Sequence, residues 1–269
     1  MRTMNEKKVA IIGGGNLGTA LVEGILHTQT MAAENVYITR RRTHLLDHLK
    51  EKKVNVLSSN VEAVEACDIV ILAIKPYQVI DILAEVKGAL NPDKIVVSFV
   101  AGVNIAELQK AAGADIPVFR AMPNTAIALG ESMTCIAFDK RWSDKQDLVE
   151  SLFKGLGSTA IINEELMAAA TVLGSCGIAY ALRFMRAATQ GGIEIGFSAE
   201  MAQFITAQTM KGASELILRS GHHPEREIDK VTTPMGITIS GLNEMEHQGF
   251  SSSLIQGLVA SYKKIEKKK

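Results

Sequence analysis

The chain has 269 residues, of which 47% are hydrophobic and 22% are charged, a composition typical of a soluble protein with a sizeable packed core. Its 29 basic residues balance 29 acidic ones, so no overall field attracts nucleic acid or an anionic membrane surface. Three widely separated cysteines, Cys67, Cys135 and Cys176, argue against a disulfide framework and against a zinc site. We expect a cytoplasmic protein with no metal, no nucleic-acid partner and no membrane segment.

The first part of the chain alternates short apolar runs with helical patterns. Stretches such as 17–28 and 79–90 have helical periodicity, and the apolar runs between such stretches are rich in β-branched residues. Continuous apolar strands that alternate with helices indicate a parallel sheet covered on both faces. The expected strands lie within residues 8–13, 36–39, 54–57, 68–74, 94–100 and 116–122.

A glycine-rich turn follows the first expected strand directly and opens the first expected helix. Its sequence, GGGNLG, fits the pattern G-x-G-x-x-G, in which glycines let the backbone approach a pyrophosphate at a helix N-terminus. The alternative is a tight turn that binds no ligand. The context favours a Rossmann-type, doubly wound domain that binds a dinucleotide through Gly13, Gly15, Asn16, Leu17 and Gly18.

The end of the second expected strand indicates which dinucleotide is bound. An NAD enzyme usually has an acidic residue there for the ribose 2′-hydroxyl, whereas this chain has the sequence TRRRT at residues 39–43. Arginine forks match a 2′-phosphate. The alternative is a solvated basic run. We expect NADPH as the cofactor, with NADH as the weaker one, and we choose Arg40 and Arg41 because they lie next to the strand end.

Two further strand ends have unusual residues. Lys75 and Pro76 follow the fourth strand, and Ala101 and Gly102 follow the fifth. Ligands bind at the carboxyl ends of strands in open α/β sheets, and small residues there leave room for a nicotinamide ring. We expect these four residues to contact the cofactor, with ordinary loop chemistry as the alternative.

The strand pattern stops after Asn163, and the rest of the chain has helical patterns at 164–191, 199–220 and 253–265. We therefore expect two domains, residues 1–162 and residues 163–269. The longest apolar stretch, 167–182, is shorter than a membrane span of about 20 residues, so we expect it to be a buried helix.

The chain lacks the proton shuttle that enzymes acting on alcohols commonly use, such as a tyrosine and lysine pair or a histidine and aspartate pair. Its histidines are scattered and fit surface positions better than catalytic ones. A protonated imine is already an electrophile, so hydride transfer to its carbon needs orientation more than acid–base help. The missing shuttle therefore favours reduction of a C=N bond.

Several motifs together resemble those of the pyrroline-5-carboxylate reductases, which reduce 1-pyrroline-5-carboxylate to L-proline in the last step of proline biosynthesis. The resemblance runs nearly from end to end, in the same order and at similar spacing. The motifs are IIGGGNLGTAL, AIKPYQ, VAGV, RAMPNTA, GSCGIAY, QGGIEIGF and TTPMGITISGL.

The resemblance implies an NADPH-binding N-terminal domain and an all-α C-terminal domain that forms a homodimer, with larger rings of dimers in many members. It implies that Met122, Pro123 and Asn124 border the nicotinamide and the substrate. A substrate loop formed by residues 236–238, namely Gly236, Ile237 and Thr238, would bind the substrate carboxylate through backbone amides. The Thr238 hydroxyl would act in catalysis by meeting the ring nitrogen, and in such dimers the loop can complete a site formed with the partner subunit.

The chain departs from the family pattern in this loop. The family usually has P-G-G-T-T, whereas residues 234–238 place Met235 at the first glycine and Ile237 at the first threonine. If the backbone needs a positive φ at Met235, a residue other than glycine is strained there. The alternative interpretation of the stretch is a helix entry, with Thr238 or Ser240 as N-cap and Gly236 as a turn residue.

Two other functions remain open from the sequence. One is an NADP-dependent β-hydroxyacid dehydrogenase, which shares the two-domain plan and would use Lys211 as its acid. The other is an NADP-binding redox sensor that no longer catalyses a reaction, because the substrate loop is altered.

Overall fold

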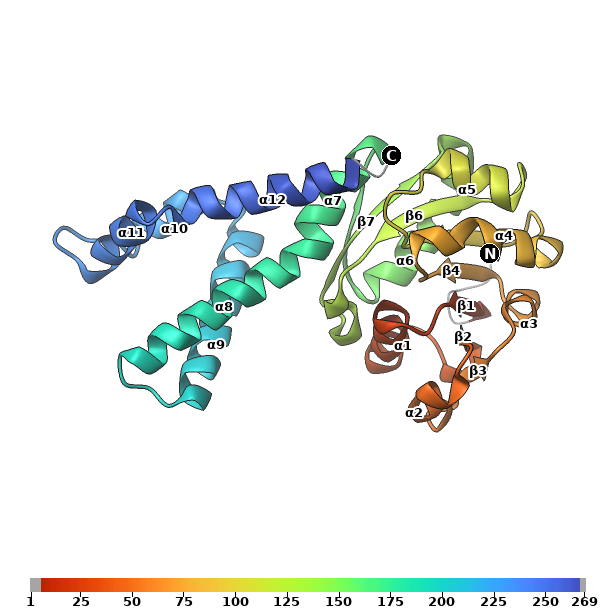
Figure 1. Ribbon diagram of the computed structural model, residues 1–269, viewed down its shortest axis with the longest axis horizontal. Coiled ribbons are helices and arrows are strands. Elements are labelled where there is room, and N and C mark those ends of the chain that lie inside the picture. The colour runs from red at the N-terminus through yellow and green to blue at the C-terminus, as the bar shows by residue number, and fades with distance from the viewer. Residues whose placement is uncertain (1–5, 267–269) are drawn as a thin grey trace. The chain divides into compact units, whose positions relative to one another are not determined.

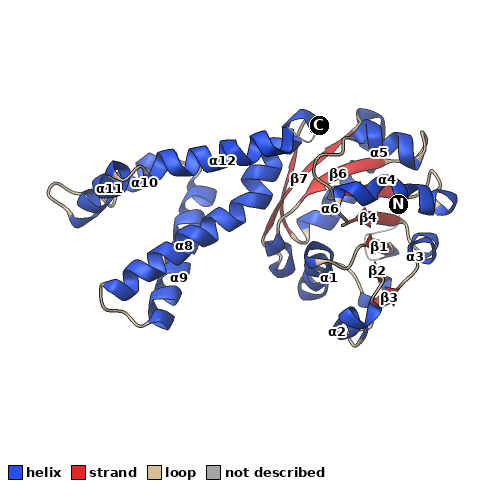
Figure 2. Cartoon of the chain, viewed as in Figure 1, coloured by secondary structure: helices blue, strands red, loops and turns tan. Residues whose placement is uncertain are grey.

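The computed structural model describes residues 6–266, which divide into two compact units. Among these residues, the first unit contains 6–176 together with 262–266, and the second contains 177–261. Figure 2 shows that strands occur only in the first unit and that the second is built from helices.

The first unit is built on one eight-stranded sheet with the strand order β3-β2-β1-β4-β5-β6-β7-β8 (Figure 1). Neighbouring strands are parallel except for β6 and β7, which are antiparallel. The order reverses between β1 and β4, the arrangement of a doubly wound sheet. The strands are β1 Val9–Ile12, β2 Val36–Thr39, β3 Asn55–Leu57, β4 Ile69–Leu72, β5 Ile95–Ser98, β6 Val118–Met122, β7 Ser132–Phe138 and β8 Gly157–Ile161.

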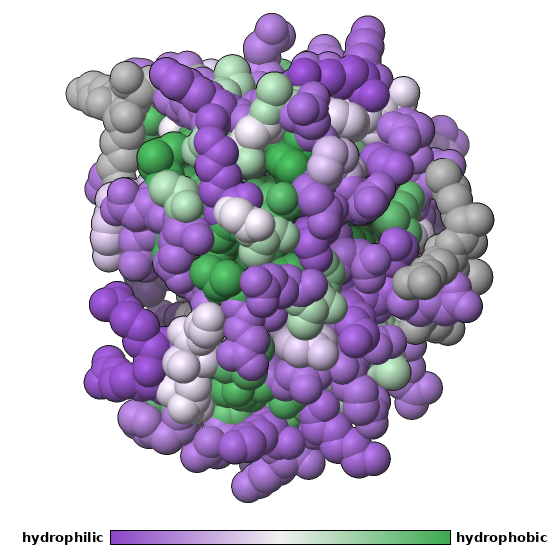
Figure 3. Space-filling model, turned by 90° about the vertical axis from the view of Figure 1, so that its right-hand side faces the viewer, coloured by the Kyte–Doolittle hydropathy of each residue, from purple (hydrophilic) through white to green (hydrophobic). Residues whose placement is uncertain are grey.

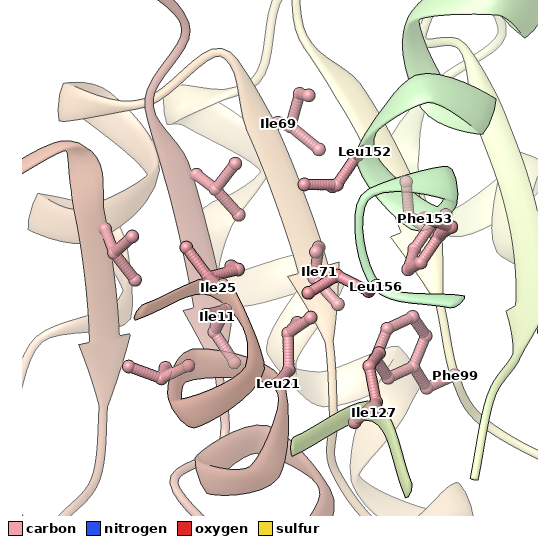
Figure 4. Packing of buried hydrophobic residues seen from close by; sticks show 14 of the residues in the cluster. Ile11, Leu21, Ile25, Ile69, Ile71, Phe99, Ile127, Leu152, Phe153 and Leu156 are labelled. Carbon is pink, nitrogen blue, oxygen red and sulfur yellow. The ribbon is translucent and has the colours of Figure 1, made fainter. Parts of the chain in front are cut away.

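Two hydrophobic layers cover the faces of this sheet, because the side chains of β1 and β4 alternate between them. On one face, Ile11 and Ile71 pack with α1, α2 and α6, as Figure 4 shows for α1 and α6. On the other, Ile12 and Leu72 pack with α3, α4 and α5. The helices of this unit are α1 Asn16–Thr28, α2 Asp47–Lys50, α3 Asn60–Ala66, α4 Val79–Val86, α5 Ile105–Ala112, α6 Gln146–Lys154 and α7 Met167–Ala170.

Short 3-10 segments and one π-helical segment join these elements. The bounds are η2 Ala33–Asn35, η3 Thr43–Leu46, η4 Pro76–Gln78, η5 Lys87–Ala89, η6 Thr125–Leu129, η7 Lys140–Lys145, η8 Glu164–Leu166 and the π-helix η9 Thr171–Cys176. The helical pattern expected over 164–191 is therefore interrupted by a π-helical turn between α7 and α8.

The second unit is helical throughout. Helices α8 and α9 pack against each other, and the Tyr180 hydroxyl on α8 lies 2.6 Å from the Ser261 hydroxyl on α12. The rings of Phe184 and Phe250 meet edge to face at 6.0 Å. The helices are α8 Gly177–Glu194, α9 Ala199–Ser220, α10 Pro224–Asp229, α11 Ile237–His247 and α12 Phe250–Glu266, of which α12 crosses the unit boundary.

The expected burial of the helix over 167–182 holds only at its start, where Met167, Thr171 and Val172 are buried. Helix α8 has no buried residue, and Leu173 and Leu182 are 72% and 57% exposed. By length and composition alone, the continuous helical stretch 164–194 could also cross a membrane. Figure 3 shows a different face of the molecule, where hydrophilic side chains dominate and hydrophobic ones form small separate areas.

Candidate functional site

A cleft of about 940 Å³ lies at the carboxyl ends of strands β1 to β5 in the first unit. It crosses the point where the strand order reverses between β1 and β4, which is where open α/β sheets bind ligands. No carboxylate lines it within the described residues. The lining residues are Ile12, Gly13, Gly14, Gly15, Asn16, Leu17, Thr39, Arg40, Arg41, Arg42, Ser58, Asn60, Ala73, Ile74, Lys75, Gln78, Ile82 and Phe99.

Three of the four glycines in the glycine turn, residues 13–18, have different structural roles. Gly13 has a φ of 111°, and a Cβ there would lie 2.5 Å from the Ala73 carbonyl oxygen. At Gly18 a Cβ would overlap the Gly13 carbonyl oxygen, so close packing of α1 against the turn requires glycine. A Cβ on Gly15 would meet nothing within 4 Å, because this glycine faces the cleft. The turn therefore exposes backbone at the start of α1, as a bound pyrophosphate requires.

The three arginines after β2 all line the cleft but differ in their contacts. The Arg40 guanidinium donates a hydrogen bond of 2.8 Å to the Gly14 carbonyl oxygen and is half-buried. Arg41 and Arg42 are exposed, and no hydrogen bond ties their side chains to any described residue. Arg40 thus supports the glycine turn, while Arg41 and Arg42 keep their guanidinium groups available for an anion.

The other expected cofactor residues divide into two groups. Lys75 is exposed and lines the cleft, and its backbone N–H is held by the Gln78 side chain at 3.3 Å. Pro76 begins η4, and Ala101 and Gly102 form the turn after β5, with a φ of 80° at Gly102; these three do not line the cleft.

Met122 ends β6, Pro123 and Asn124 follow it, and all three are buried outside the cleft. The Asn124 side chain accepts from the Ala126 backbone N–H at 3.0 Å and donates to the Gly174 carbonyl at 3.2 Å. It therefore ties the end of β6 to the π-helical turn.

Residues 232–238 belong to the second unit. The Gly236 N–H donates to the Thr233 carbonyl at 2.8 Å, which closes a turn around Pro234 and Met235. Met235 has a φ of 59°, as a type II turn requires at this position, so the positive φ considered from the sequence is present.

Gly236, and not Thr238 or Ser240, is the N-cap of α11. In the first turn of that helix, the backbone N–H groups of Ile237, Thr238 and Ile239 have no acceptor among the described residues. Helix starts with free amides attract anions. The Thr238 side chain is exposed, and its hydroxyl makes no hydrogen bond to the described residues.

The cleft also contains residues that the sequence interpretation missed. Thr39 ends β2, Ser58 follows β3 and Asn60 begins α3, while Phe99 directly follows β5. Thr39 is the last residue of β2 and Phe99 directly follows β5, and this position at a strand end was the available sign of a site. Only the strand order shows that the ends of β2 and β3 are adjacent.

Reactive groups outside the cleft are few within residues 6–266. Burial raises the pKa of the Cys67 thiol to about 12, so this cysteine stays protonated at neutral pH. No group of three His, Cys, Asp or Glu side chains in the described chain could hold a metal ion. Lys211 is exposed on α9.

Two family models match the chain in sequence. One, described as pyrroline-5-carboxylate reductase dimerisation, matches residues 164–268, and the other, described as NADP oxidoreductase coenzyme F420-dependent, matches residues 8–102. The first therefore covers the helical part of the chain, and the second covers the glycine turn and the strand ends that form the cleft.

Proteins named pyrroline-5-carboxylate reductase are similar along almost the whole chain. Pyrroline-5-carboxylate reductase 2 of Dictyostelium discoideum is 40% identical over 98% of this chain and 93% of its own length. Pyrroline-5-carboxylate reductase 1 of the same organism is 42% identical over 94% of this chain, which spans about half (48%) of that relative. The crystal structure of Plasmodium falciparum pyrroline carboxylate reductase with NADP bound has a TM-score of 0.90 at 28% identity and covers 99% of both chains. Since the likeness extends over both units and nearly the full length of a 40% identical relative, the chain belongs to the pyrroline-5-carboxylate reductase family.

Proposed function

We propose that the protein reduces the C=N bond of 1-pyrroline-5-carboxylate to give L-proline, with NADPH as the hydride donor. The single observation that carries the proposal is the likeness to reductases of this name, which extends over 94% to 98% of this chain. NADP is bound in the similar Plasmodium falciparum structure. The β-hydroxyacid dehydrogenase and the redox sensor are not favoured, because the relatives named here are reductases.

The cleft residues fit a dinucleotide phosphate. The glycine turn gives a pyrophosphate access to backbone N–H groups at the start of α1, and Gly15 leaves open space there. Arg41 and Arg42 would pair with the 2′-phosphate, and Arg40 would support the turn. When bound, NADPH supplies the hydride that the imine carbon accepts.

The free N–H groups of Ile237 and Thr238 would hold the substrate carboxylate at the start of α11. Gly236 would shape this site but would not donate, because its own N–H is engaged by Thr233. The Thr238 hydroxyl would hydrogen-bond the ring nitrogen and orient the imine. Within the first unit, Met122, Pro123 and Asn124 would border the nicotinamide, as the family resemblance implies, with Asn124 fixed by its bonds to Ala126 and Gly174.

We further propose that the protein acts in the cytoplasm as a homodimer formed by its helical part. The match of residues 164–268 to a dimerisation family supports this, as do the three cysteines, which are all free. The same family match supports the interpretation that a protein partner, and not a membrane, covers the apolar helical stretch 164–194.

The decisive experiment is the initial rate of NADPH oxidation with 1-pyrroline-5-carboxylate, followed by absorbance and compared with NADH and with the six-membered cyclic imine. We expect fast turnover of the five-membered substrate with NADPH, and Thr238→Ala should lower kcat. Lys211→Ala is the control, and its rate should equal that of the unchanged protein. Absence of turnover on both rings, with NADPH still bound, would contradict the proposed reaction.

A further inference from the structure

A chain of hydrogen bonds lies behind the cleft at the end formed by β2 and β3. The Thr39 hydroxyl lies 2.7 Å from the Asn60 side-chain oxygen, and the Asn60 side-chain nitrogen lies 3.2 and 3.3 Å from the two carboxylate oxygens of Glu85 on α4. Thr39 also contacts the glycine turn. Its hydroxyl accepts from the Gly13 N–H at 3.4 Å, and its carbonyl accepts from the Gly14 N–H at 2.7 Å.

The chemistry of the two outer groups, the Gly13 N–H and the Glu85 carboxylate, sets the direction of the bonds in this chain. A backbone N–H can only donate, so the Thr39 hydroxyl accepts from Gly13 and keeps its own proton for Asn60. An ionised carboxylate can only accept, so the Asn60 nitrogen must face Glu85. Glu85 therefore requires the Asn60 nitrogen on its side, and Thr39 favours the same orientation, because its buried hydroxyl proton has the Asn60 oxygen as its acceptor among the described residues.

This orientation decides what Asn60 offers to a ligand. Asn60 lines the cleft, and its oxygen is occupied by the Thr39 hydroxyl. A bifurcated contact with the two Glu85 oxygens uses one N–H, so a second N–H remains as a donor. Asn60 lies at the same end of the cleft as Arg41 and Arg42, whose guanidinium groups also only donate.

We propose that Thr39 is a positioning residue that holds the Asn60 amide as a hydrogen-bond donor to the 2′-phosphate of NADP(H), and so contributes to the preference for NADPH over NADH. A phosphate accepts such a donor, whereas an amide oxygen turned toward the ligand would repel a phosphate and accept from the 2′-hydroxyl of NADH. Thr39 is only 2% exposed and Glu85 is exposed, so the buried hydroxyl is the main restraint and the carboxylate reinforces it.

The test is the affinity of the full-length protein for NADP⁺ and for NAD⁺, measured by isothermal titration calorimetry. Thr39→Val keeps the side-chain shape but removes the hydroxyl. We expect it to weaken NADP⁺ binding about tenfold, roughly the worth of one charge-assisted hydrogen bond, and to change NAD⁺ binding less than about twofold. Thr39→Ser, the matched control, keeps the hydroxyl and should therefore keep the preference for NADP⁺ over NAD⁺.

Glu85 provides a second test at the surface, where a substitution leaves the core unchanged. Glu85→Ala should weaken NADP⁺ binding about threefold, since an exposed hydrogen bond is worth less than a buried one, and Glu85→Gln should retain binding because its amide oxygen still accepts. Asn60→Asp should shift the preference toward NAD⁺.

The inference is overturned if Thr39→Val weakens both cofactors equally, because Thr39 would then only support the glycine turn. Should this variant not fold, unchanged NADP⁺ affinity in Glu85→Ala would overturn it. The inference rests on the proposed function for its cofactor, but no imine is present in these titrations. A wrong substrate would therefore appear in the turnover assay and leave these affinities intact.

Discussion

Gly15 and Gly18 belong to the same turn, but a side chain would have different effects at the two positions. Gly15→Leu should reduce NADPH binding below detection without lowering the melting temperature, because its Cβ meets only open cleft. Gly18→Ala is the comparison, and it should lower the melting temperature because its Cβ overlaps the Gly13 carbonyl oxygen. Calorimetric titration and thermal unfolding measure the two effects. Retained affinity in Gly15→Leu would show that no pyrophosphate lies on this turn.

Substitutions of the three arginines after β2 should likewise have different effects on cofactor binding. Replacing Arg41 and Arg42 together with Ala should raise the KM for NADPH about tenfold or more and spare NADH, because only NADPH has the 2′-phosphate. Arg40→Ala should raise the KM for both cofactors, since Arg40 supports the Gly14 carbonyl of the shared turn. Steady-state kinetics with each cofactor provides the measurement. An equal loss for both cofactors in the Arg41 and Arg42 double variant would contradict a role in binding the 2′-phosphate.

Met235 is strained, with a φ of 59° and a fully exposed side chain. A left-handed conformation costs a residue other than glycine roughly 1 kcal/mol, so Met235→Gly should stabilise the protein by about that amount. Lys53→Gly is the matched control, because Lys53 has a φ of 68° on the exposed surface of the other unit. Both variants should raise the melting temperature, but only Met235→Gly should change the KM for the imine. A lower melting temperature in Met235→Gly would refute the strain at this position.

Among the elements, the six expected strands are confirmed as β1 to β6. Most are apolar runs bounded by turns, the mark of a strand buried on both faces, whereas β3 at the sheet edge is partly exposed. Strands β7 and β8 were missed. In β8, the sequence GSTAI has few apolar residues and leaves the strand partly exposed at the edge of the sheet. The antiparallel course of β7 depends on pairing with β6 and cannot be deduced from a local pattern.

The candidate site was predictable only where its residues adjoin a strand end. The glycine turn and the arginines lie at the ends of β1 and β2, and the sequence located both. By contrast, Asn60 belongs to the site because β3 lies beside β2 and because Thr39 and Glu85 orient its amide. Such a hydrogen-bond network joins residues far apart in the chain, so it leaves no periodic pattern in the sequence.

Arg120 on β6 forms an ion pair that connects three elements. Its guanidinium lies 3.1 Å from the Glu164 carboxylate in η8, and the same carboxylate oxygen accepts from the Ile105 N–H at the start of α5, at 2.6 Å. Burial lowers the pKa of Arg120 below its ordinary value, while the hydrogen bond to Glu164 acts in the opposite direction. The ion pair with Glu164 thus offsets the cost of burying the positive charge of Arg120 in the first unit.

Removing Glu164 should therefore destabilise the first unit more than an ordinary surface substitution. We expect Glu164→Ala to cost about 3 kcal/mol, because it leaves Arg120 buried without its partner. Denaturant unfolding, followed by the fluorescence of the single tryptophan, Trp142, in the same unit, provides the measurement. Glu165→Ala, one residue further along η8, is the control and should cost little. A loss in Glu164→Ala below about 0.5 kcal/mol would mean that water satisfies Arg120.

At the scale of the whole molecule, the second unit exposes far more apolar surface than a soluble single chain usually does. Ile195 and Leu218 are 79% and 77% exposed, and Phe204 is 66% exposed. Large apolar side chains exposed in such number are typical of an interface between proteins. The sequence interpretation expected part of this surface to be buried, and the match of residues 164–268 to a dimerisation family supports the proposal that a second copy of the chain covers it.

Apolar contact should consequently hold the proposed homodimer together. Light scattering coupled to gel filtration should give at least twice the chain mass of 29.0 kDa. Replacing both Phe204 and Leu218 with Glu should give a monomer that aggregates less readily. Burying the two new carboxylates in the interface would cost more free energy than the apolar contacts contribute. Ile80→Glu, on the exposed side of α4 in the first unit, adds the same kind of charge and should leave the assembly unchanged. If the double variant has the same assembly mass as the unchanged protein, these side chains lie outside the interface. If the unchanged protein itself has the mass of a monomer, the dimer is excluded.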